Sequence, residues 1–515
     1  MKKLALLILA GATVLSFAGC QASKESLSSP AVPEAESSIS ASTDNSKRED
    51  IIIYSSSEPD TLDQHDTETL SAATLVRNLY ANLYRLNADG ALVPELADHF
   101  MVNEDFTEYT FTLKDNLKFS DGSPLTASDV VYTFQRAKNG GGTYYERLKE
   151  LQAPDEHTVV VTLKQPNNAF LNELTAEYMC VMSRTAIENG MDIDNLPTIT
   201  SGAYTVERWI KGEYIQLKAN PYYLNGEPSI KTAKILYQLP DISPYQALLN
   251  GTIDYISSVS TEEIPYLKAD DNVELICYDN LAWNFLSLNE TDPHLSDIHV
   301  RNAIYYALDL EYIIDTALDG LATPAPIIVN GSISGYLPGC DAIDFNLNRA
   351  KECMAASAYP DGFDLTIEVG TETREKVAEE ISVLLSEIGI RVTVERKELS
   401  EVLRDLFDYS YTAAISSYSM ASRIISHAAP LFRAGDSLNF SRSPDGEIGE
   451  LLEKSTEADN DEKVQYLTRA YQRMKELNLY IGLYWPTIYD AKNASLQQSE
   501  PVISEKFIIA NMSWK

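Results

Sequence analysis

The stretch from Gly90 to Arg136 constrains the fold of this 515-residue chain more than any other segment. Between residues 109 and 113, apolar and polar side chains alternate with period two, which is typical of a half-buried strand. Residues 117–119 offer a short partner strand, and Asp-Gly-Ser-Pro at 121–124 is strong turn chemistry. The spacing of residues 126–129 is that of a helix capping box, which predicts a helix from there on. None of these local signals is a catalytic motif.

The length and charge of the chain narrow its possible architectures and partners. A chain of 515 residues exceeds a single ordinary core, so two or three domains are expected. Hydrophobic residues make up 44% of the sequence, which predicts that most of it is globular. The formal net charge of −35, from 41 basic and 76 acidic residues, argues against nucleic acid as a partner, because phosphate binding needs a positive surface.

The first twenty residues have the pattern of a secretory signal. Lys2 and Lys3 precede an apolar run from Leu4 to Val14, which is too short to span a membrane comfortably. The segment resembles a bacterial lipoprotein signal, residues 1–19, after which Cys20 would carry the lipid as the first residue of the mature chain. An ordinary cleaved signal is the alternative. Lipidation would anchor the chain to the membrane without spanning it.

Residues 20–50 predict a flexible tether and not a folded domain. They are rich in Ser, Ala and Glu and contain almost no large apolar side chain, so they cannot bury enough surface to fold. The four cysteines beyond Cys20 show no Cys-x-x-Cys spacing, so disulfides and buried free thiols both stay open.

Several further segments carry structural motifs in a definite order. Residues 51–54 form an apolar run typical of a buried strand, and leucines within residues 70–86 have helical spacing. The remaining motifs are Glu-Pro-x-Thr-Leu-Asp at 58–63, Ser-Gly-Ala-Tyr at 201–204, Asn-Pro-Tyr-Tyr at 220–223, the run at 246–254, the amphipathic helix at 300–309, the helical stripe at 464–477 and Tyr-Trp-Pro at 484–486.

Together with the stretch at 90–136, these motifs resemble those of the family 5 extracellular solute-binding proteins of ABC importers, the oligopeptide, dipeptide and nickel group. The resemblance covers nearly everything after the tether. It implies an α/β, two-lobed, periplasmic-binding-protein-like fold with an extra subdomain in the first lobe and a hinge between the lobes. A solute would bind between the lobes, which would close around it and deliver it to permease subunits in the membrane.

In this family the chain crosses between the lobes, so pieces far apart in the sequence build one lobe. The expected division is a first lobe from residues 51–93, 199–280 and 490–515, an extra subdomain within residues 94–198, and a second lobe from residues 281–489. The resemblance also implies a monomer on the extracellular face of the cell membrane, held there by its lipid.

The sequence contains no constellation of catalytic or metal-binding residues. The six histidines are scattered and form no His-Glu-x-x-His motif, and no nucleotide-binding glycine motif is present. At residues 331–335 two glycines flank Ile333, where a hydrolase would need a nucleophile. We therefore expect no enzyme, no cofactor and no resident metal. An extracellular chaperone or adhesin is the alternative from another class.

The ligand implied by the resemblance is a peptide, with a nickel or metallophore chelate as the alternative. Peptide-binding relatives often hold the free α-amino group with an aspartate, but this chain has no carboxylate between Asp408 and Asp436. Arg423 stands near the expected position and could bind a carboxylate in bidentate fashion. His427, one helical turn further on, could complete a chelate site. A solvated Arg423 and a packed His427 are the structural alternatives.

Further candidates for the ligand site lie elsewhere in the chain. Arg374, before a predicted helix at 377–388, is near the position of a carboxylate-binding arginine in dipeptide-type relatives. Simple packing or solvation is the alternative role for each candidate. The others are Ser56, Ser57 and Glu58 after the first strand, and Tyr418 and Trp485 as aromatic walls.

Overall fold

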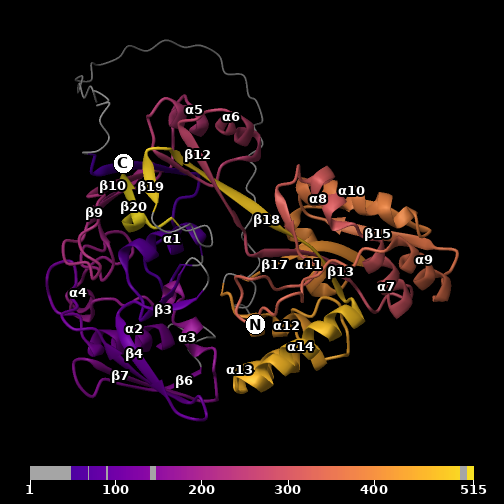
Figure 1. The fold of residues 1–515 in the computed structure, drawn as a ribbon, viewed down its shortest axis with the longest axis horizontal. Helices are drawn as coiled ribbons and strands as arrows, with labels where there is room; N and C mark the ends of the chain where they lie inside the picture. Colours follow the sequence, from indigo (N-terminus) through magenta and orange to yellow (C-terminus); the bar gives the residue numbers. More distant parts are fainter. Residues whose placement is uncertain (1–47, 68, 88–90, 140–146, 421, 499–506) are drawn as a thin grey trace, which may run out of the picture.

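The computed structural model describes residues 48–515, apart from 68, 88–90, 140–146, 421 and 499–506. The predicted signal segment, Cys20 and most of the predicted tether lie outside the described residues. Figure 1 shows two lobes, one built from the first half of the chain and its last strands, the other from the residues between them. This is the two-lobed α/β arrangement that the resemblance implied.

The central sheet of the first lobe is built around strand β1. Ile51 and Ile53 of this strand are almost fully buried, as expected for an apolar run with neighbours on both sides. β1 runs parallel to β10 and β11, whereas β10, β9 and β8 pair in antiparallel fashion. The spatial order is β11 (Tyr255–Ser257), β1 (Asp50–Ser55), β10 (Thr232–Leu236), β9 (Tyr214–Ala219) and β8 (Tyr204–Ile210). The helices of this part are α1 (Leu70–Leu79), α5 (Pro244–Leu249), η4 (Thr261–Glu263) and α6 (Ile264–Lys268).

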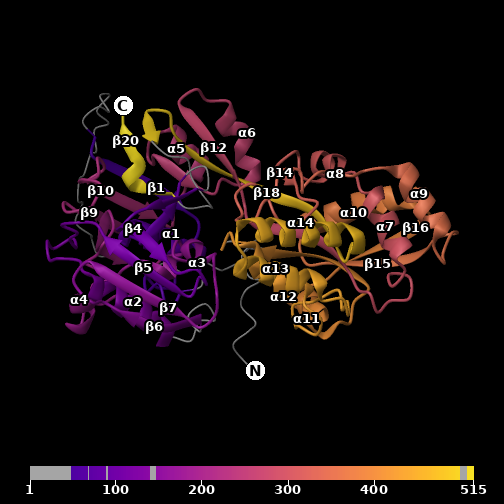
Figure 2. The same ribbon diagram turned by 60° about the horizontal axis from the view of Figure 1, so that its bottom comes forward.

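A separate four-stranded antiparallel sheet lies next to the first and forms, with its helices, what we term the extra subdomain (Figure 2). In β5, Tyr109, Phe111 and Leu113 are buried, which confirms the predicted alternation. Thr126 N–H donates to the Asp129 carboxylate (3.0 Å), one half of the predicted capping box. The strands, in order, are β4 (Ala97–Val102), β5 (Glu108–Leu113), β7 (Thr158–Leu163) and β6 (Leu148–Gln152), and the hairpin β2 (Tyr84–Leu86) and β3 (Leu92–Pro94) precedes them. The helices are α2 (Ala127–Asn139), α3 (Phe170–Glu173), η3 (Glu177–Met179) and α4 (Arg184–Glu188).

The second lobe is a mixed sheet with helices on both faces. The neighbours Phe285 and Leu286 belong to different apolar clusters, because successive side chains of a strand point to opposite faces. The strands are β16 (Ile390–Arg396), β15 (Phe363–Val369), β17 (Ala413–Ser419), β13 (Ala282–Leu288) and β14 (Ala322–Pro324). The helices are α7 (Ile298–Ala307), α8 (Leu310–Ala317), α9 (Leu347–Ala356), α10 (Glu372–Ser386), α11 (Leu399–Asp408), η5 (Ile425–Ala428), α12 (Ala429–Phe432), α13 (Glu447–Glu457) and α14 (Asn460–Leu477). No helix in the described part of the chain combines the length and the apolar character needed to cross a membrane.

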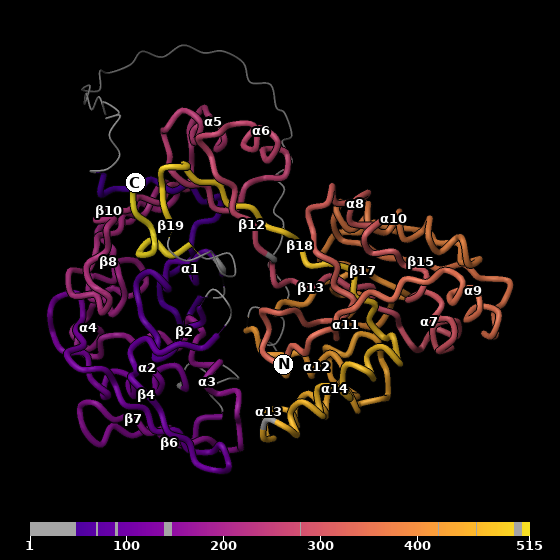
Figure 3. Tube along the Cα trace, viewed as in Figure 1, coloured from indigo at the N-terminus to yellow at the C-terminus, as the bar shows by residue number. Residues whose placement is uncertain are grey.

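Strand β18 (Tyr480–Asn493) belongs to both lobes. Its residues 480–484 pair with β13, and its residues 487–493 pair with β12 (Val273–Asp279), which leads into β13. The chain therefore passes between the lobes on two neighbouring strands, and the tube in Figure 3 shows them at the crossing. Two adjacent extended segments are a suitable hinge. The chain ends with β19 (Leu496–Gln498), η6 (Ile509–Asn511) and β20 (Met512–Trp514), which complete the first lobe.

Two local predictions are wrong in detail, in each case because of hydrogen bonds to other segments. The helix predicted within residues 70–86 ends at Leu79, whose carbonyl accepts a hydrogen bond from Gly202 N–H (2.8 Å). Residues 117–119 pair with residues 123–125 and not with the preceding strand, since the turn between them folds the chain straight back.

Candidate functional site

Arg374 lies in the first turn of α10, and the local sequence fixes its position. The Thr371 side chain caps the helix by accepting a hydrogen bond from Arg374 N–H (3.3 Å). The guanidinium reaches the sheet, where Nη2 donates to Ser417 Oγ (2.8 Å). Nε and Nη2 also lie 3.4 Å from Asn284 Oδ1. Three segments far apart in the sequence thus hold one cation.

The charge of Arg374 is not balanced by any acidic side chain in the described part of the chain. Burial lowers the pKa of Arg374, and the nearby Tyr484 hydroxyl acts in the opposite direction. Burial likewise raises the pKa of Tyr484 to about 12, so this phenol is neutral beside the cation. A half-buried guanidinium that is held only by neutral oxygen atoms favours an added carboxylate or phosphate, which can accept two hydrogen bonds.

Arg423 and His427 lie in a different place, where the second lobe meets the extra subdomain. The Arg423 side chain donates to Ser332 O (3.4 Å), and burial lowers its pKa to about 10 while Glu177 opposes that shift. His427 Nε2 lies 4.0 Å from Glu173 Oε1. Burial, reinforced by Arg147, lowers the pKa of His427 to about 3.

Segment 409–435 contains no carboxylate, and the acidic side chains near Arg423 and His427 come from another part of the chain. Glu173 and Glu177 belong to the extra subdomain, about 250 residues earlier in the chain, so local sequence could not reveal them. Arg423 and His427 therefore face acidic side chains of the other lobe in this structure. Their prediction as ligand contacts stays a prediction.

Glu58 has structural partners inside the first lobe. Its carboxylate accepts hydrogen bonds from Trp209 Nε1 (2.8 Å) and Gly212 N–H (2.9 Å), which tie it to the turn between β8 and β9. Ser56 and Ser57 follow β1 and are exposed. The two serine side chains are thus accessible to a solute, whereas Glu58 is half-buried and held by partners in its own lobe.

Tyr418 and Trp485 are core residues of the second lobe and not an exposed wall. Trp485 is 1% exposed and belongs to the apolar cluster below β13. Tyr418 is 6% exposed, and its hydroxyl donates to His427 O (2.7 Å). Strand alternation explains the difference from Ser417, which precedes Tyr418 and points to Arg374 on the opposite face. In this structure both rings are packed in the core, and their role as walls of the ligand site stays a prediction.

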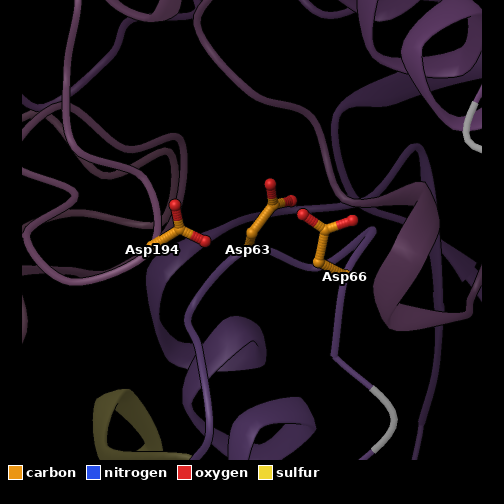
Figure 4. Close-up of side chains that lie close together, drawn as sticks. All are labelled: Asp63, Asp66 and Asp194. Atoms are coloured by element: carbon orange, nitrogen blue, oxygen red, sulfur yellow. The ribbon is translucent and has the colours of Figure 1, made fainter.

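Three aspartates of the first lobe form the only group in the described residues whose spacing suits a metal ion (Figure 4). One oxygen from each of Asp63, Asp66 and Asp194 lies within 4.8 Å of the others. However, the buried Asp63 carboxylate already pairs with both guanidinium nitrogens of Arg136, and Asp194 accepts from Thr61 Oγ1 (2.8 Å). The ion pair between Asp63 and Arg136 fixes the loop after β1 to α2, and it accounts for the position of the Asp63 carboxylate without a metal ion.

The residues that surround Arg374 in the structure were not predicted from the sequence as part of the site. Asn284 and Ser417 lie 90 and 43 positions from Arg374, and Tyr484 is further still. No local pattern marks them, because a polar residue in a strand is equally compatible with solvent exposure. Only the pairing of β13 with β17 and β18 brings these side chains together.

Comparison with known proteins gives consistent matches along the chain. The family described as bacterial extracellular solute-binding proteins, family 5 Middle, matches residues 91–427. Glutathione-binding protein GsiB of Salmonella typhimurium is 27% identical over 354 residues, which cover 67% of this chain and 69% of the relative. The structure of HbpA2 from Haemophilus parasuis has a TM-score of 0.81 at 23% identity, over 90% of this chain and 100% of that one. The unliganded open form of MppA, a periplasmic murein tripeptide binding protein, has a TM-score of 0.81 at 19% identity, over 91% and 98%. These matches confirm the predicted fold class.

Proposed function

Because this chain belongs to the bacterial extracellular solute-binding proteins of family 5, we propose that it captures a short peptide between its lobes and that Arg374 binds the terminal carboxylate of that peptide. Proteins of this family are the solute-binding components of ABC importers and are not enzymes. The proposal concerns the chemical class of the solute and the side chain that recognises it.

The observation that carries the proposal is the unbalanced, half-buried charge of Arg374. A guanidinium without a carboxylate partner binds an anion with a large gain in free energy, because the cost of removing its water was already incurred when the chain folded. Every unmodified peptide carries a terminal carboxylate. The names of two similar proteins also point to small peptides, because glutathione and the murein tripeptide are both tripeptide-sized.

The partners of this function are an ABC permease and a membrane surface. We propose that the loaded chain docks on the permease as a monomer and that Cys20, once lipidated, holds it at the extracellular face of the membrane. The tether at residues 20–50 would then give the folded lobes freedom to reach the permease. The mass of the N-terminal fragment of membrane-extracted chain tests the lipid directly, since an unmodified Cys20 would contradict it.

Calorimetric titration with trialanine and with trialanine amide tests the role of Arg374. We expect the unaltered chain to bind trialanine more tightly than the amide, because only the acid offers a carboxylate. Arg374→Ala should weaken trialanine binding about 10- to 100-fold, as expected for a lost charge-assisted hydrogen-bond pair. The variant should also no longer distinguish the acid from the amide.

Arg391→Ala provides the matched control, since Arg391 lies on the same lobe and pairs with Asp364 at the surface. This variant should keep both the affinity and the preference for the acid. Equal binding of acid and amide by the unaltered chain would exclude Arg374 as the carboxylate site. Native mass spectrometry of the purified chain, followed by identification of released molecules, would show whether peptides are bound at all.

A further inference from the structure

The two lobes touch each other at a second place, away from the strands that connect them. Asn168 of the extra subdomain, just before α3, meets the end of helix α13 in the second lobe. In Figure 1, α3 and α13 lie below the crossing strands β12 and β18, on facing sides of the two lobes. The contact therefore lies where hinge motion would separate the lobes.

At this contact, Asn168 donates hydrogen bonds to carbonyl groups at the C-terminal end of α13. The last carbonyl groups of a helix have no partner within the helix and need donors from elsewhere. Asn168 N–H donates to Thr456 O (2.7 Å), and Asn168 Nδ2 donates to Ser455 O (3.3 Å) and to Ala458 O. A residue of one lobe thus supplies the C-terminal cap of a helix in the other lobe.

A buried carboxylate lies beside this cap. Arg147 Nη1 (2.8 Å) and Asn167 Nδ2 (3.0 Å) fix the Glu173 carboxylate within the extra subdomain. The same carboxylate is 2% exposed and lies 4.0 Å from His427 Nε2 of the second lobe. Nearby, Glu177 acts on the charge of Arg423. Half-buried and buried polar groups of both lobes therefore lie near each other beside the cap.

We propose that Asn168, Glu173 and Glu177 of the extra subdomain form a clasp with residues 423–427 and 455–458 of the second lobe. This clasp holds the lobes together and is the contact at which the hinge closes. This assignment rests on the proposed function only in assuming that the lobes close around a solute. Opening the lobes would expose the carbonyl groups of α13 and the Glu173 carboxylate to water. The clasp thus favours the state in which the lobes touch, before any contribution from a solute.

Hydrogen exchange measured by mass spectrometry on the full chain, without added peptide, tests the clasp. Asn168→Ala should speed exchange about fivefold or more in residues 423–428 and 453–459, which belong to the opposite lobe. Asn168→Asp keeps the shape of the side chain but places a negative charge at the negative end of α13, so its effect should be larger. Asn172→Ala is the control, because in the described structure the Asn172 side chain makes no hydrogen bond to the second lobe.

A cysteine pair at Asn168 and Thr456 provides the complementary measurement. The Asn168 nitrogen and the Thr456 carbonyl oxygen lie 2.7 Å apart, and a disulfide formed between the two positions should slow exchange in both segments of the second lobe. Unchanged exchange in both Asn168 variants would overturn the proposal. Because no peptide is present, this result does not depend on whether trialanine binds Arg374.

Discussion

Two histidines with lowered pKa values reduce the stability of this protein in mild acid. Burial lowers the pKa of His427 to about 3 and that of His65 to about 4, with Arg147 and Arg136 acting in the same direction. Below the ordinary histidine pKa of about 6.5, the unfolded chain binds protons that the folded chain excludes, so stability falls with falling pH. Asp490 has the opposite effect, because its pKa is raised to about 6 and the folded state takes up its proton first.

Replacing His427 by Gln should therefore flatten the dependence of unfolding free energy on pH between 6.5 and 5. The slope should decrease by about 1 kcal/mol per pH unit, close to the maximum for one proton. Urea denaturation at pH 7, 6 and 5 measures it, with the exposed His157→Gln as the control. An unchanged slope would mean that His427 titrates normally and is not enclosed between the lobes.

At the scale of residues, sequence could identify charged groups but not their partners. Arg374 was found because it is near the position of a carboxylate-binding arginine in dipeptide-type relatives, whereas Asn284 and Ser417 are polar residues in strands that no motif marks. Glu58 and Trp485 were predicted as solute contacts on the basis of residue type. Residue type does not reveal that Trp209 donates a hydrogen bond to Glu58, or that Trp485 is enclosed in an apolar core.

Strand β18 passes very close to the backbone of a neighbouring segment at Gly482. A Cβ atom on Gly482 would lie 2.0 Å from Ala325 O and 2.7 Å from Pro326 C. These are backbone atoms of the segment that leads away from β14, so they cannot rotate aside. Only glycine allows the two segments to approach this closely.

Gly482→Ala should consequently destabilise the protein by about 2–4 kcal/mol, through displacement of β18 or of the segment it touches. Urea denaturation measures the loss. Gly331→Ala is the matched control, because a Cβ there meets no atom within 4 Å, and it should change stability by less than about 0.5 kcal/mol. A Gly482→Ala protein as stable as the control would contradict the close approach.

Helices and strands could be predicted where the sequence pattern that defines them lies entirely within the segment itself. The alternation at 109–113 and the capping residues at 126–129 are local, and both occur in the structure. The end of α1 at Leu79 was not predictable, because the hydrogen bond that stops the helix comes from Gly202. The pairing of β5 with β7 likewise depends on a segment outside the recognised block.

For the whole molecule, the two lobes differ in how they are assembled from the chain. The two apolar clusters of the second lobe contain only residues between 281 and 485. The cluster around β1 instead combines residues from near both ends, including Ile51 and Met512. The boundary expected at residues 489 and 490 falls inside the single strand β18, because sequence motifs do not show that one strand serves two sheets.

A fragment of residues 281–486 should therefore fold without the first lobe. It contains its own sheet and both apolar clusters, so we expect a single cooperative transition in urea by circular dichroism and tryptophan fluorescence. The converse fragment, residues 48–280, lacks β18 and β20 and should not show such a transition. A fragment 281–486 without a cooperative transition would mean that the second lobe depends on its contacts with the first.

The final strand also has a consequence for the timing of folding. Trp514 donates to Asp50 O (2.8 Å), and its ring lies 4.2 Å from the Arg48 guanidinium, so nearly the last residue secures the first strand. When the chain emerges with its N-terminus first, the second lobe can finish while the first lobe still waits for its last strands. The part synthesised earliest is thus the part completed latest, and during synthesis the second lobe should acquire protection before β1 does.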